Sequence, residues 1–330
     1  IAAFEQREMA ISKERSDRAI KVIDMGSQGA SGKTPTNATT VIKSARPIDT
    51  IGRYEIVREL GRGAMGVVYL ALDPLINREV AVKTLRYQDA DAKEMAESRT
   101  RFFSEAKAIG KLSHPNIVNV YDVGEHKGMA YIAMEFLDGT DLIPYCEKNK
   151  LLPLLDVIRI VSSAAVALDY AHKNSIVHRD VKPGNIRILK NGDIKVIDFG
   201  IARVMEPSKT STGSIVGSPS YMSPEQINGQ PLDGRSDLFS LGVIFYELLT
   251  GDKPFKGDNF TSLLLQITSS TPIPVRRLVS DIPERCEAIL EKALTKDKEQ
   301  RYQTGREFAD DLLRITESMT VEVPATPRTS

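Results

Sequence analysis

Apolar and polar residues alternate along the chain from about residue 54, as they do in strands that bury one face. "YEIVREL" begins this pattern, and "VVYLALD" and "EVAVKTL" continue it after short turns. The next segment, "KEMAESRTRFFSEAKAIGKL", has helical spacing, and "IVNVYDVGEHKGMAYIAMEFL" predicts two more strands with a turn at "EHKG". Residues 54–137 are therefore predicted to form a small antiparallel sheet with one main helix.

From about Leu154 the pattern becomes mostly helical. "LLDVIRIVSSAAVALDYAHKN" carries an apolar stripe at helical spacing, and "SDLFSLGVIFYELLTG" is almost wholly apolar, which predicts a buried helix. We expect Ser236 to cap the start of that helix and Gly251 to end it. "PERCEAILEKALT" and "TGREFADDLLRIT" predict two further amphipathic helices. The fold class is thus α+β, with a larger, mostly helical part over residues 138–316.

The two ends of the chain lack such periodicity. Residues 1–50 are predicted to be a flexible linker, since residues 26–46 are dense in Gly, Ser, Thr, Asn and Pro, and residues 317–330 are predicted to be a disordered tail. The chain begins at Ile1 and not at Met, so we expect it to be a piece of a longer protein. "IAAF" fits either a solvated linker helix or the end of an upstream transmembrane helix, which would make residues 1–50 a juxtamembrane segment.

Charge and cysteine content narrow the class of protein. Lys plus Arg and Asp plus Glu both number 44, so the balance of charge suggests neither a nucleic-acid partner nor an anionic membrane surface. The two cysteines, Cys146 and Cys286, are far apart and form no disulfide or zinc pattern, which fits a reducing, cytoplasmic setting. No apolar run approaches the roughly 20 residues that span a bilayer.

Two glycine clusters compete as phosphate-binding loops. "SQGASGKT", residues 27–34, ends like a P-loop, but Ser27 replaces the first glycine and a Thr-rich, Pro-bracketed run follows instead of a helix. A phosphate-binding role for Lys33 is therefore rejected. The second cluster, "GRGAMGVVY", places Gly61, Gly63 and Gly66 in a turn between strands, where backbone N–H groups can approach phosphate oxygens.

Charged side chains that suit phosphate chemistry follow this second cluster. Lys83, in "VAVKTL", can reach under the loop, and Glu105 of the predicted helix can pair with it. In "HRDVKPGN", Asp180 can accept a hydroxyl proton and Lys182 can steady a phosphoryl group. Two carboxylates and an amide on converging loops suit Mg²⁺, and the residues that provide them are Asp180, Asn185 and Asp198.

These motifs, taken in order, resemble those of the eukaryotic-like protein Ser/Thr kinases of bacteria. The set comprises the glycine loop, V-A-V-K ending at Lys83, H-R-D ending at Asp180, Asn185, D-F-G at 198–200, and Ser223-Pro224-Glu225 in place of A-P-E. The resemblance covers residues 54–316. It implies a bilobal kinase fold, with an N-lobe over 54–137 and a C-lobe over 138–316. It also implies transfer of the γ-phosphoryl group of ATP to protein Ser or Thr hydroxyls, with Mg²⁺, or Mn²⁺ in its place.

The resemblance further assigns individual residues. Lys83 would contact the phosphates and Glu105, Asp180 would be the catalytic base, and Asn185 and Asp198 would hold the metal ion. The adenine pocket would comprise Val68, Ala81, the gatekeeper Met134 and a hinge from Glu135 to Leu137. Three further residues are implied to be architectural: Glu225 and Arg301 as a buried ion pair, and Asp237 as a brace for the catalytic loop.

Regulation is implied by Arg179, which precedes the catalytic Asp. Kinases with this arginine are usually switched by phosphorylation of the activation loop, because the cation needs an anionic partner. We expect autophosphorylation in trans at Thr210 and Thr212, within a homodimer, although a merely polar Ser- and Thr-rich loop is the alternative. Ser218 stands where the family usually has Thr and keeps the hydroxyl. We expect a transmembrane or sensor region upstream of this chain, and the sequence does not identify the protein substrates.

Arg187 departs from the resemblance. Two residues after Asn185, the family normally places an apolar Leu or Met on the floor of the adenine pocket. An unpaired buried charge is costly, so the guanidinium would have to stack on adenine or turn towards solvent along the cleft. The third alternative is that Arg187 weakens ATP binding. The chain would then be a catalytically weak pseudokinase that acts as a scaffold.

Overall fold

The structure, a computed structural model, describes residues 50–63, 66–85, 92–199 and 219–321. Its strands are β1 (Thr50–Ile51), β2 (Tyr54–Gly63), β3 (Gly66–Asp73), β4 (Arg78–Leu85), β5 (Val120–His126), β6 (Met129–Glu135), β7 (Gly139–Asp141), β8 (Ile186–Leu189) and β9 (Ile194–Val196). Its α-helices are α2 (Ala92–Ile109), α3 (Leu154–Lys173), α4 (Pro224–Ile227), α5 (Gly234–Thr250), α6 (Phe260–Ser269), α7 (Val275–Leu278), α8 (Glu284–Ala293) and α9 (Gly305–Val321). None of the helices in these ranges has the length and apolar character needed to cross a membrane.

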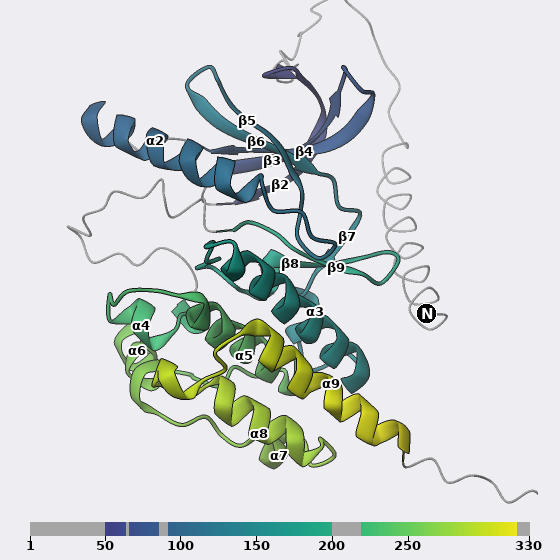
Figure 1. Ribbon diagram of the computed structural model, residues 1–330, viewed down its shortest axis with the longest axis vertical. Coiled ribbons are helices and arrows are strands. Elements are labelled where there is room, and N and C mark those ends of the chain that lie inside the picture. Colours follow the sequence, from purple (N-terminus) through teal and green to yellow (C-terminus); the bar gives the residue numbers. More distant parts are fainter. Residues whose placement is uncertain (1–49, 64–65, 86–91, 200–218, 322–330) are drawn as a thin grey trace, which may run out of the picture. The chain divides into compact units, whose positions relative to one another are not determined.

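Six strands form one antiparallel sheet in the order β1-β2-β3-β4-β6-β5, with α2 beside β5 (Figure 1). Alternate residues of β4 face opposite sides of this sheet. Val80 and Val82 join a small cluster on one face, whereas Ala81 and Leu85 join the main hydrophobic core on the other. Lys83 has the parity of Ala81 and Leu85, so the two-residue period of a strand places its side chain on the core face.

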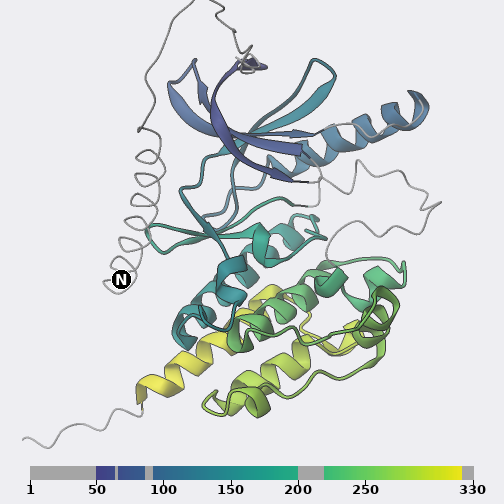
Figure 2. The same cartoon turned by 180° about the vertical axis from the view of Figure 1, so that it is seen from behind.

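A second sheet has three short strands in the order β7-β8-β9. Figures 1 and 2 show it from opposite sides, between the six-stranded sheet and the helices. Val196 of β9 also bridges to Ile117, in the segment that leads to β5. This sheet matters for the site because Asn185 directly precedes β8 and Asp198 closely follows β9.

Helix α5 forms the centre of the helical part, where its residues from Ser236 to Thr250 are buried. Gly251 ends it as predicted, with φ of 70° and its N–H bonded to the carbonyl of Glu247. The predicted cap at the other end is wrong, because Asp233 and not Ser236 caps the helix. Ser236 lies in the first turn instead and donates from Oγ to Glu225, 2.6 Å away, so a tertiary bond takes the place of the local one.

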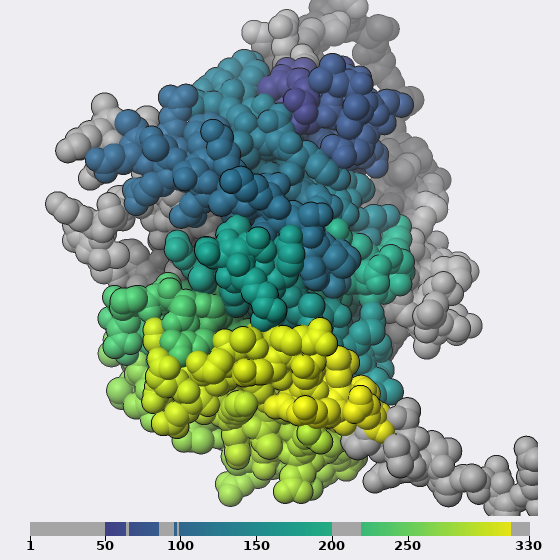
Figure 3. Space-filling view, in the orientation of Figure 1, coloured from purple at the N-terminus to yellow at the C-terminus, as the bar shows by residue number. Residues whose placement is uncertain are grey.

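Helix α9 packs against α3 and lies across the surface of the helical part (Figure 3). It runs to Val321, so the predicted start of the disordered tail at residue 317 is wrong by five residues. Neither Gly nor Pro interrupts the sequence between residue 317 and Val321, and nothing local ends the helix there. The remainder of the predicted tail and residues 1–49 of the predicted linker lie outside the described residues.

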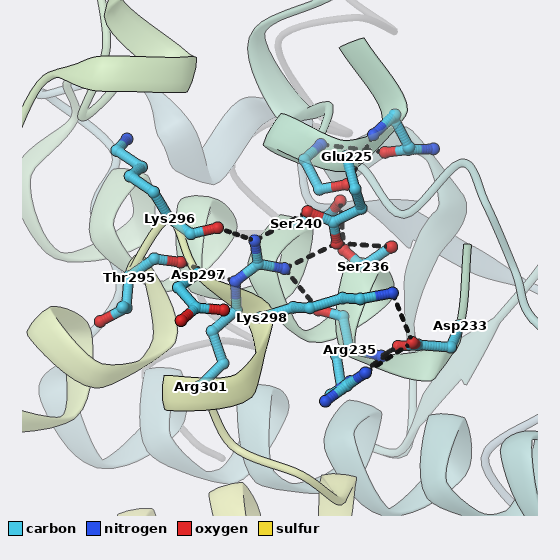
Figure 4. Close-up of polar contacts among 12 residues, drawn as sticks. Glu225, Asp233, Arg235, Ser236, Ser240, Thr295, Lys296, Asp297, Lys298 and Arg301 are labelled. Atoms are coloured by element: carbon cyan, nitrogen blue, oxygen red, sulfur yellow. Dashed lines mark hydrogen bonds and ion pairs between the residues drawn. The ribbon is translucent and has the colours of Figure 1, made fainter. Parts of the chain in front are cut away.

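The predicted ion pair between Glu225 and Arg301 is confirmed, and it is fully buried (Figure 4). Two bonds of 2.7 Å join the guanidinium to both carboxylate oxygens, which is the bidentate geometry of a strong pair. Arg301 also donates to the carbonyls of Thr295 and Lys296. Burial alone would raise the pKa of Glu225, but bonds from Arg301 and Ser236 hold that pKa below its usual value. The pair joins α4 to the segment before α9.

Lys296 makes the stability of the fold depend measurably on pH. Its side chain points away from the Glu225–Arg301 pair (Figure 4), its Nζ lies 3.6 Å from the ring centre of Phe255, and it donates to the carbonyl of Ile267 over 2.7 Å. Burial, with the charge of Arg301 in the same direction, lowers the pKa of Lys296 to about 7. Above that pH the unfolded chain binds a proton that the folded chain does not, so stability rises with pH.

We therefore expect the free energy of unfolding of the unmodified protein to rise, relative to that of Lys296→Met, between pH 7 and pH 9. Urea denaturation of both proteins across this range measures the difference. Lys292→Met on the exposed surface of α8 is the matched control, and it should show no such divergence. Parallel pH profiles for the unmodified protein and Lys296→Met would contradict the expectation.

Candidate active site

A cavity of about 230 Å³ lies between the six-stranded sheet and the β7–β9 sheet. Its walls are mainly aliphatic, with a few polar groups at defined positions, which is the usual composition of a ligand pocket. Two of the glycines that the sequence assigned to a nucleotide site, Gly63 and Gly66, do not line this cavity. The other assigned residues do line it, and they are Gly61, Val68, Ala81, Lys83, Met134, Glu135, Leu137 and Arg187. Leu60, Val118, Phe136, Ile197 and Asp198 complete the lining.

The two remaining glycines close the hairpin between β2 and β3. Gly63 pairs with Gly66, and Gly61 pairs with Val68, so the two predicted strands that flank the glycine cluster pair with one another. Gly66 has φ of 153°, and a Cβ atom there would lie 1.7 Å from the carbonyl oxygen of Thr84. Only glycine therefore allows β3 to approach β4 at this point. Gly61 and Gly63 have open space around them, which leaves their backbone accessible beside the cavity.

A network of polar side chains, which the sequence did not predict, fixes the hinge segment after β6. Glu135 Oε2 accepts from Lys195 Nζ over 2.8 Å and from Asn119 Nδ2 over 3.0 Å. Lys195 is 8% exposed and also donates to the carbonyl of Ile117. The network joins the hinge to β9 and to the segment before β5. The one available signal was a lysine inside the otherwise apolar strand "IKVID".

Lys83 pairs with Asp198 in this structure, and the predicted pair with Glu105 is wrong for this conformation. Its Nζ lies 2.8 Å from Asp198 Oδ2, whereas the Glu105 carboxylate lies 3.6 Å from the guanidinium of Arg179. Partial burial raises the pKa of Glu105, and the charge of Arg179 opposes that rise.

The loop before β8 brings Asp180, Lys182 and Asn185 together. Lys182 Nζ lies 2.7 Å from Asp180 Oδ2, and Asn185 Nδ2 donates to the same oxygen over 3.1 Å. The second Asn185 N–H donates to the backbone carbonyl of Asp180 over 2.7 Å. The Asp180 side chain is 36% exposed, so its carboxylate is fixed in orientation and remains accessible to a reactant.

Asp237 braces this loop as predicted. Its carboxylate accepts from the backbone N–H groups of His178 and Arg179, each over 2.8 Å, and it lies 2.7 Å from His172 Nε2. Arg179 has φ of 66°, a conformation that a non-glycine residue holds only when its surroundings fix it. The buried carboxylate of α5 thus sets the backbone from which Asp180 projects.

Asn185 and Asp198 fit a divalent cation. Both N–H groups of the Asn185 side chain are engaged by Asp180, which leaves its carbonyl oxygen as an acceptor. Asp198 uses Oδ2 for Lys83, which leaves Oδ1. The two loops are linked directly, since Ile197 N–H donates to the Asn185 carbonyl and the His178 ring bonds to the Ile197 carbonyl. Oxygen donors of this kind suit a hard cation shared with phosphate groups.

Arg187 lies on β8 and lines the cavity, as the resemblance implied. It donates through Nη2 to the carbonyl oxygen of Gly139 in β7. Four other assigned positions, Gly200, Thr210, Thr212 and Ser218, lie outside the described residues.

Comparisons with known proteins identify the family that has this arrangement of lobes, glycine hairpin and paired loops. The family model of the protein kinase domain matches residues 54–313. The chain is 40% identical over 279 residues to serine/threonine-protein kinase PknB of Mycolicibacterium smegmatis, which covers 82% of this chain and 44% of that protein. It is 42% identical over 278 residues to PknB of Mycobacterium leprae, with the same two shares, and 40% identical over 262 residues to PrkC of Bacillus subtilis, with shares of 79% and 40%.

The chain therefore belongs to the protein kinase family. It spans about two fifths of the length of the curated relatives it matches. Members of this family generally use ATP and a divalent metal ion.

Proposed function

We propose that this domain transfers the γ-phosphoryl group of ATP to Ser or Thr hydroxyls of proteins. The observation that carries the proposal is the oriented Asp180 carboxylate, held with Lys182 and Asn185 on a loop that is bonded to the Asp198 loop of the nucleotide cavity. The printed names of the relatives, all serine/threonine-protein kinases, supply the hydroxyl class. No observation on the chain or its relatives favours the pseudokinase alternative.

Each side chain has a defined part in the proposed reaction. The Asp180 carboxylate orients the attacking hydroxyl and accepts its proton, while the Lys182 ammonium neutralises charge on the transferring group. Lys83 binds phosphate oxygens, and the glycine hairpin covers them with backbone N–H groups. Asn185 and Asp198 would hold Mg²⁺, or Mn²⁺ in its place, which neutralises phosphate charge when bound. The cavity between β3, β4 and β8 binds the base.

Incubation with γ-labelled ATP, Mg²⁺ and a general protein substrate such as myelin basic protein tests this proposal. Acid hydrolysis of the product should release phosphoserine and phosphothreonine and no phosphotyrosine. Label confined to phosphotyrosine would contradict the proposed hydroxyl class.

We further propose that phosphorylation switches the ion pairs of α2. The Glu105–Arg179 and Lys83–Asp198 pairs represent a resting arrangement. A phosphate on Thr210 or Thr212 offers Arg179 a stronger anion, which frees Glu105 to pair with Lys83 and positions that lysine for the nucleotide. A second copy of the chain would transfer this phosphate from ATP in trans.

Glu105→Gln is therefore expected to act mainly on the phosphorylated protein. Loss of one charged hydrogen bond, worth roughly 1.5–3 kcal/mol, corresponds to a fall of about ten- to a hundred-fold in kcat/KM after preincubation with ATP. Steady-state kinetics on protein with and without preincubation measures this. Glu97→Gln on the exposed surface of the same helix is the control. Equal losses in the two forms would contradict the switch.

We propose that the domain acts in the cytoplasm. The two cysteines are unpaired, which fits a reducing cytoplasm where ATP is available. The matched region covers 44% and 40% of two relatives, and we propose that a sensor or membrane-anchored region lies outside this chain.

A further inference from the structure

Ile143 is an exposed aliphatic residue that the chain fixes beside the catalytic loop. It begins the 3₁₀ turn η1 (Ile143–Cys146), and 57% of its surface is exposed. The residue before it, Leu142, is fully buried, and its N–H donates to the carbonyls of Pro183 and Ile186, each over 3.1 Å. These backbone bonds tie the start of η1 to the catalytic loop, so the position of Ile143 at the surface is set by the fold.

The Ile143 side chain lies against a glycine of this loop. Gly184 is the middle residue of the turn η2 (Pro183–Asn185), and a Cβ atom on Gly184 would lie 3.3 Å from Ile143 Cδ1. Asn185, the next residue, donates to Asp180 through both N–H groups of its side chain. The contact path from Ile143 to the Asp180 carboxylate is therefore at most on the order of 15 Å, which about four or five residues of extended chain can span.

The surface beside Ile143 is uncharged. The turns η1 and η2 have the sequences IPYC and PGN, and neither contains an acidic or basic residue. The nearest acid along the chain, Asp141, accepts from the Ile143 N–H over 3.0 Å. A basic side chain of a substrate would find no carboxylate within these two turns. An aliphatic side chain would instead cover Ile143 and remove apolar surface of both molecules from water.

We propose that Ile143 is a specificity-determining residue that binds an aliphatic side chain close to the phosphorylated Ser or Thr of a protein substrate. A hydroxyl placed at Asp180 brings residues within about five positions of it, on one side, over η2 and Ile143. Single exposed aliphatic residues are common on proteins, and it is the fixed place of this one beside the acceptor site that carries the assignment. The inference rests on the proposed function, since it takes Asp180 as the residue that receives the hydroxyl.

Steady-state kinetics with a set of peptides tests this inference. Each peptide has one Thr acceptor in a Gly- and Ser-rich background, and a single Leu occupies one of the five positions on either side. For the unmodified protein, Leu at one position or at two adjacent positions should raise kcat/KM by roughly three- to tenfold, as expected from partial burial of one aliphatic side chain. In Ile143→Ser this gain should fall below about twofold, through a higher KM for the peptide. The conservative variant Ile143→Leu should retain the gain.

Ile143→Asp gives a second test with a readout that a purely structural role would not change. A carboxylate in place of the aliphatic side chain should shift the preference at the same peptide position from Leu to Lys. Leu75→Ser is the matched control, because Leu75 is 76% exposed and lies in the turn between β3 and β4 of the six-stranded sheet. It should keep the preference for Leu.

The peptide set separates the possible outcomes. Equal kcat/KM across the set for the unmodified protein would overturn the inference, and so would an unchanged preference for Leu in Ile143→Ser. A higher KM for ATP alone in Ile143→Ser would also overturn it, because Ile143 would then belong to the nucleotide site. Phosphorylation of neither the peptides nor myelin basic protein by the unmodified protein would instead defeat the proposed function.

Discussion

Asp180→Asn is expected to abolish most phosphoryl transfer while the domain stays folded and binds nucleotide. The substitution preserves the shape of the side chain, but an amide cannot accept the proton of the attacking hydroxyl. General base catalysis contributes roughly 10²–10⁴-fold in such reactions, so kcat should fall by about that factor. The Asp237 bonds that hold the loop do not involve the Asp180 side chain, and the fold should be unaffected. A coupled assay of ADP release with saturating peptide measures kcat.

The control for this variant is Asp193→Asn, in the exposed turn between β8 and β9. It makes the same chemical change on the same sheet, away from the cavity, and kcat should stay within about twofold of the unmodified value. A kcat for Asp180→Asn equal to that of the control would refute the assignment of the base. Reduced nucleotide affinity of Asp180→Asn would indicate a binding role instead.

Arg301→Met is expected to cause the largest loss of stability among single substitutions at buried polar sites of the described part of the chain. The Glu225 carboxylate would remain buried, with Ser236 as its one other recorded side-chain donor. Removal of one partner from a buried pair costs about 3–5 kcal/mol, because the charge that is left has no counterion. The carbonyls of Thr295 and Lys296 would lose a donor as well. Urea denaturation measures the free energy of unfolding.

Two comparisons sharpen this prediction. Arg306→Met breaks an exposed ion pair with Asp310 on α9 and should cost less than about 1 kcal/mol. The double variant Glu225→Gln with Arg301→Met leaves no uncompensated charge at this buried pair and should be more stable than Arg301→Met alone. A double variant as unstable as the single one would show that packing, and not an uncompensated charge, accounts for the loss.

Much of the fold could be predicted from local pattern. The alternation in "EVAVKTL" fixed both the strand and the face of Lys83, and the apolar run of α5 indicated a buried helix. Short elements have too few residues to show a recognisable pattern of apolar and polar positions. β7 and β8 have only three and four residues, and they form because neighbouring segments supply their hydrogen-bond partners. The cap of α5 was misassigned because Asp233 and Ser236 are both residue types that cap helices well. In the structure Asp233 accepts from a backbone N–H of the first turn, whereas the Ser236 hydroxyl donates to Glu225.

The candidate site likewise has a part that could be predicted from the sequence and a part that could not. Motif order placed Lys83, Asp180, Asn185 and Asp198 near one cleft, because each motif fixes its own short segment. Partners in distant segments could be predicted only where the family resemblance supplied them, as for Glu225 and Arg301. Lys83 pairs with Asp198 and not Glu105 because α2 holds Glu105 beside Arg179. The Glu135–Lys195 pair was likewise missed, since it joins residues 60 positions apart through a contact that no local pattern encodes.

Intact-mass spectrometry before and after Mg-ATP tests the central claim, protein phosphorylation by this chain, most directly. Dephosphorylated protein should gain one or more phosphates, with peptide mapping to Thr210 or Thr212, and Asp180→Asn should gain none. No gain by the unmodified protein, under conditions in which it binds ATP, would contradict the assignment of this domain as an active, self-phosphorylating kinase.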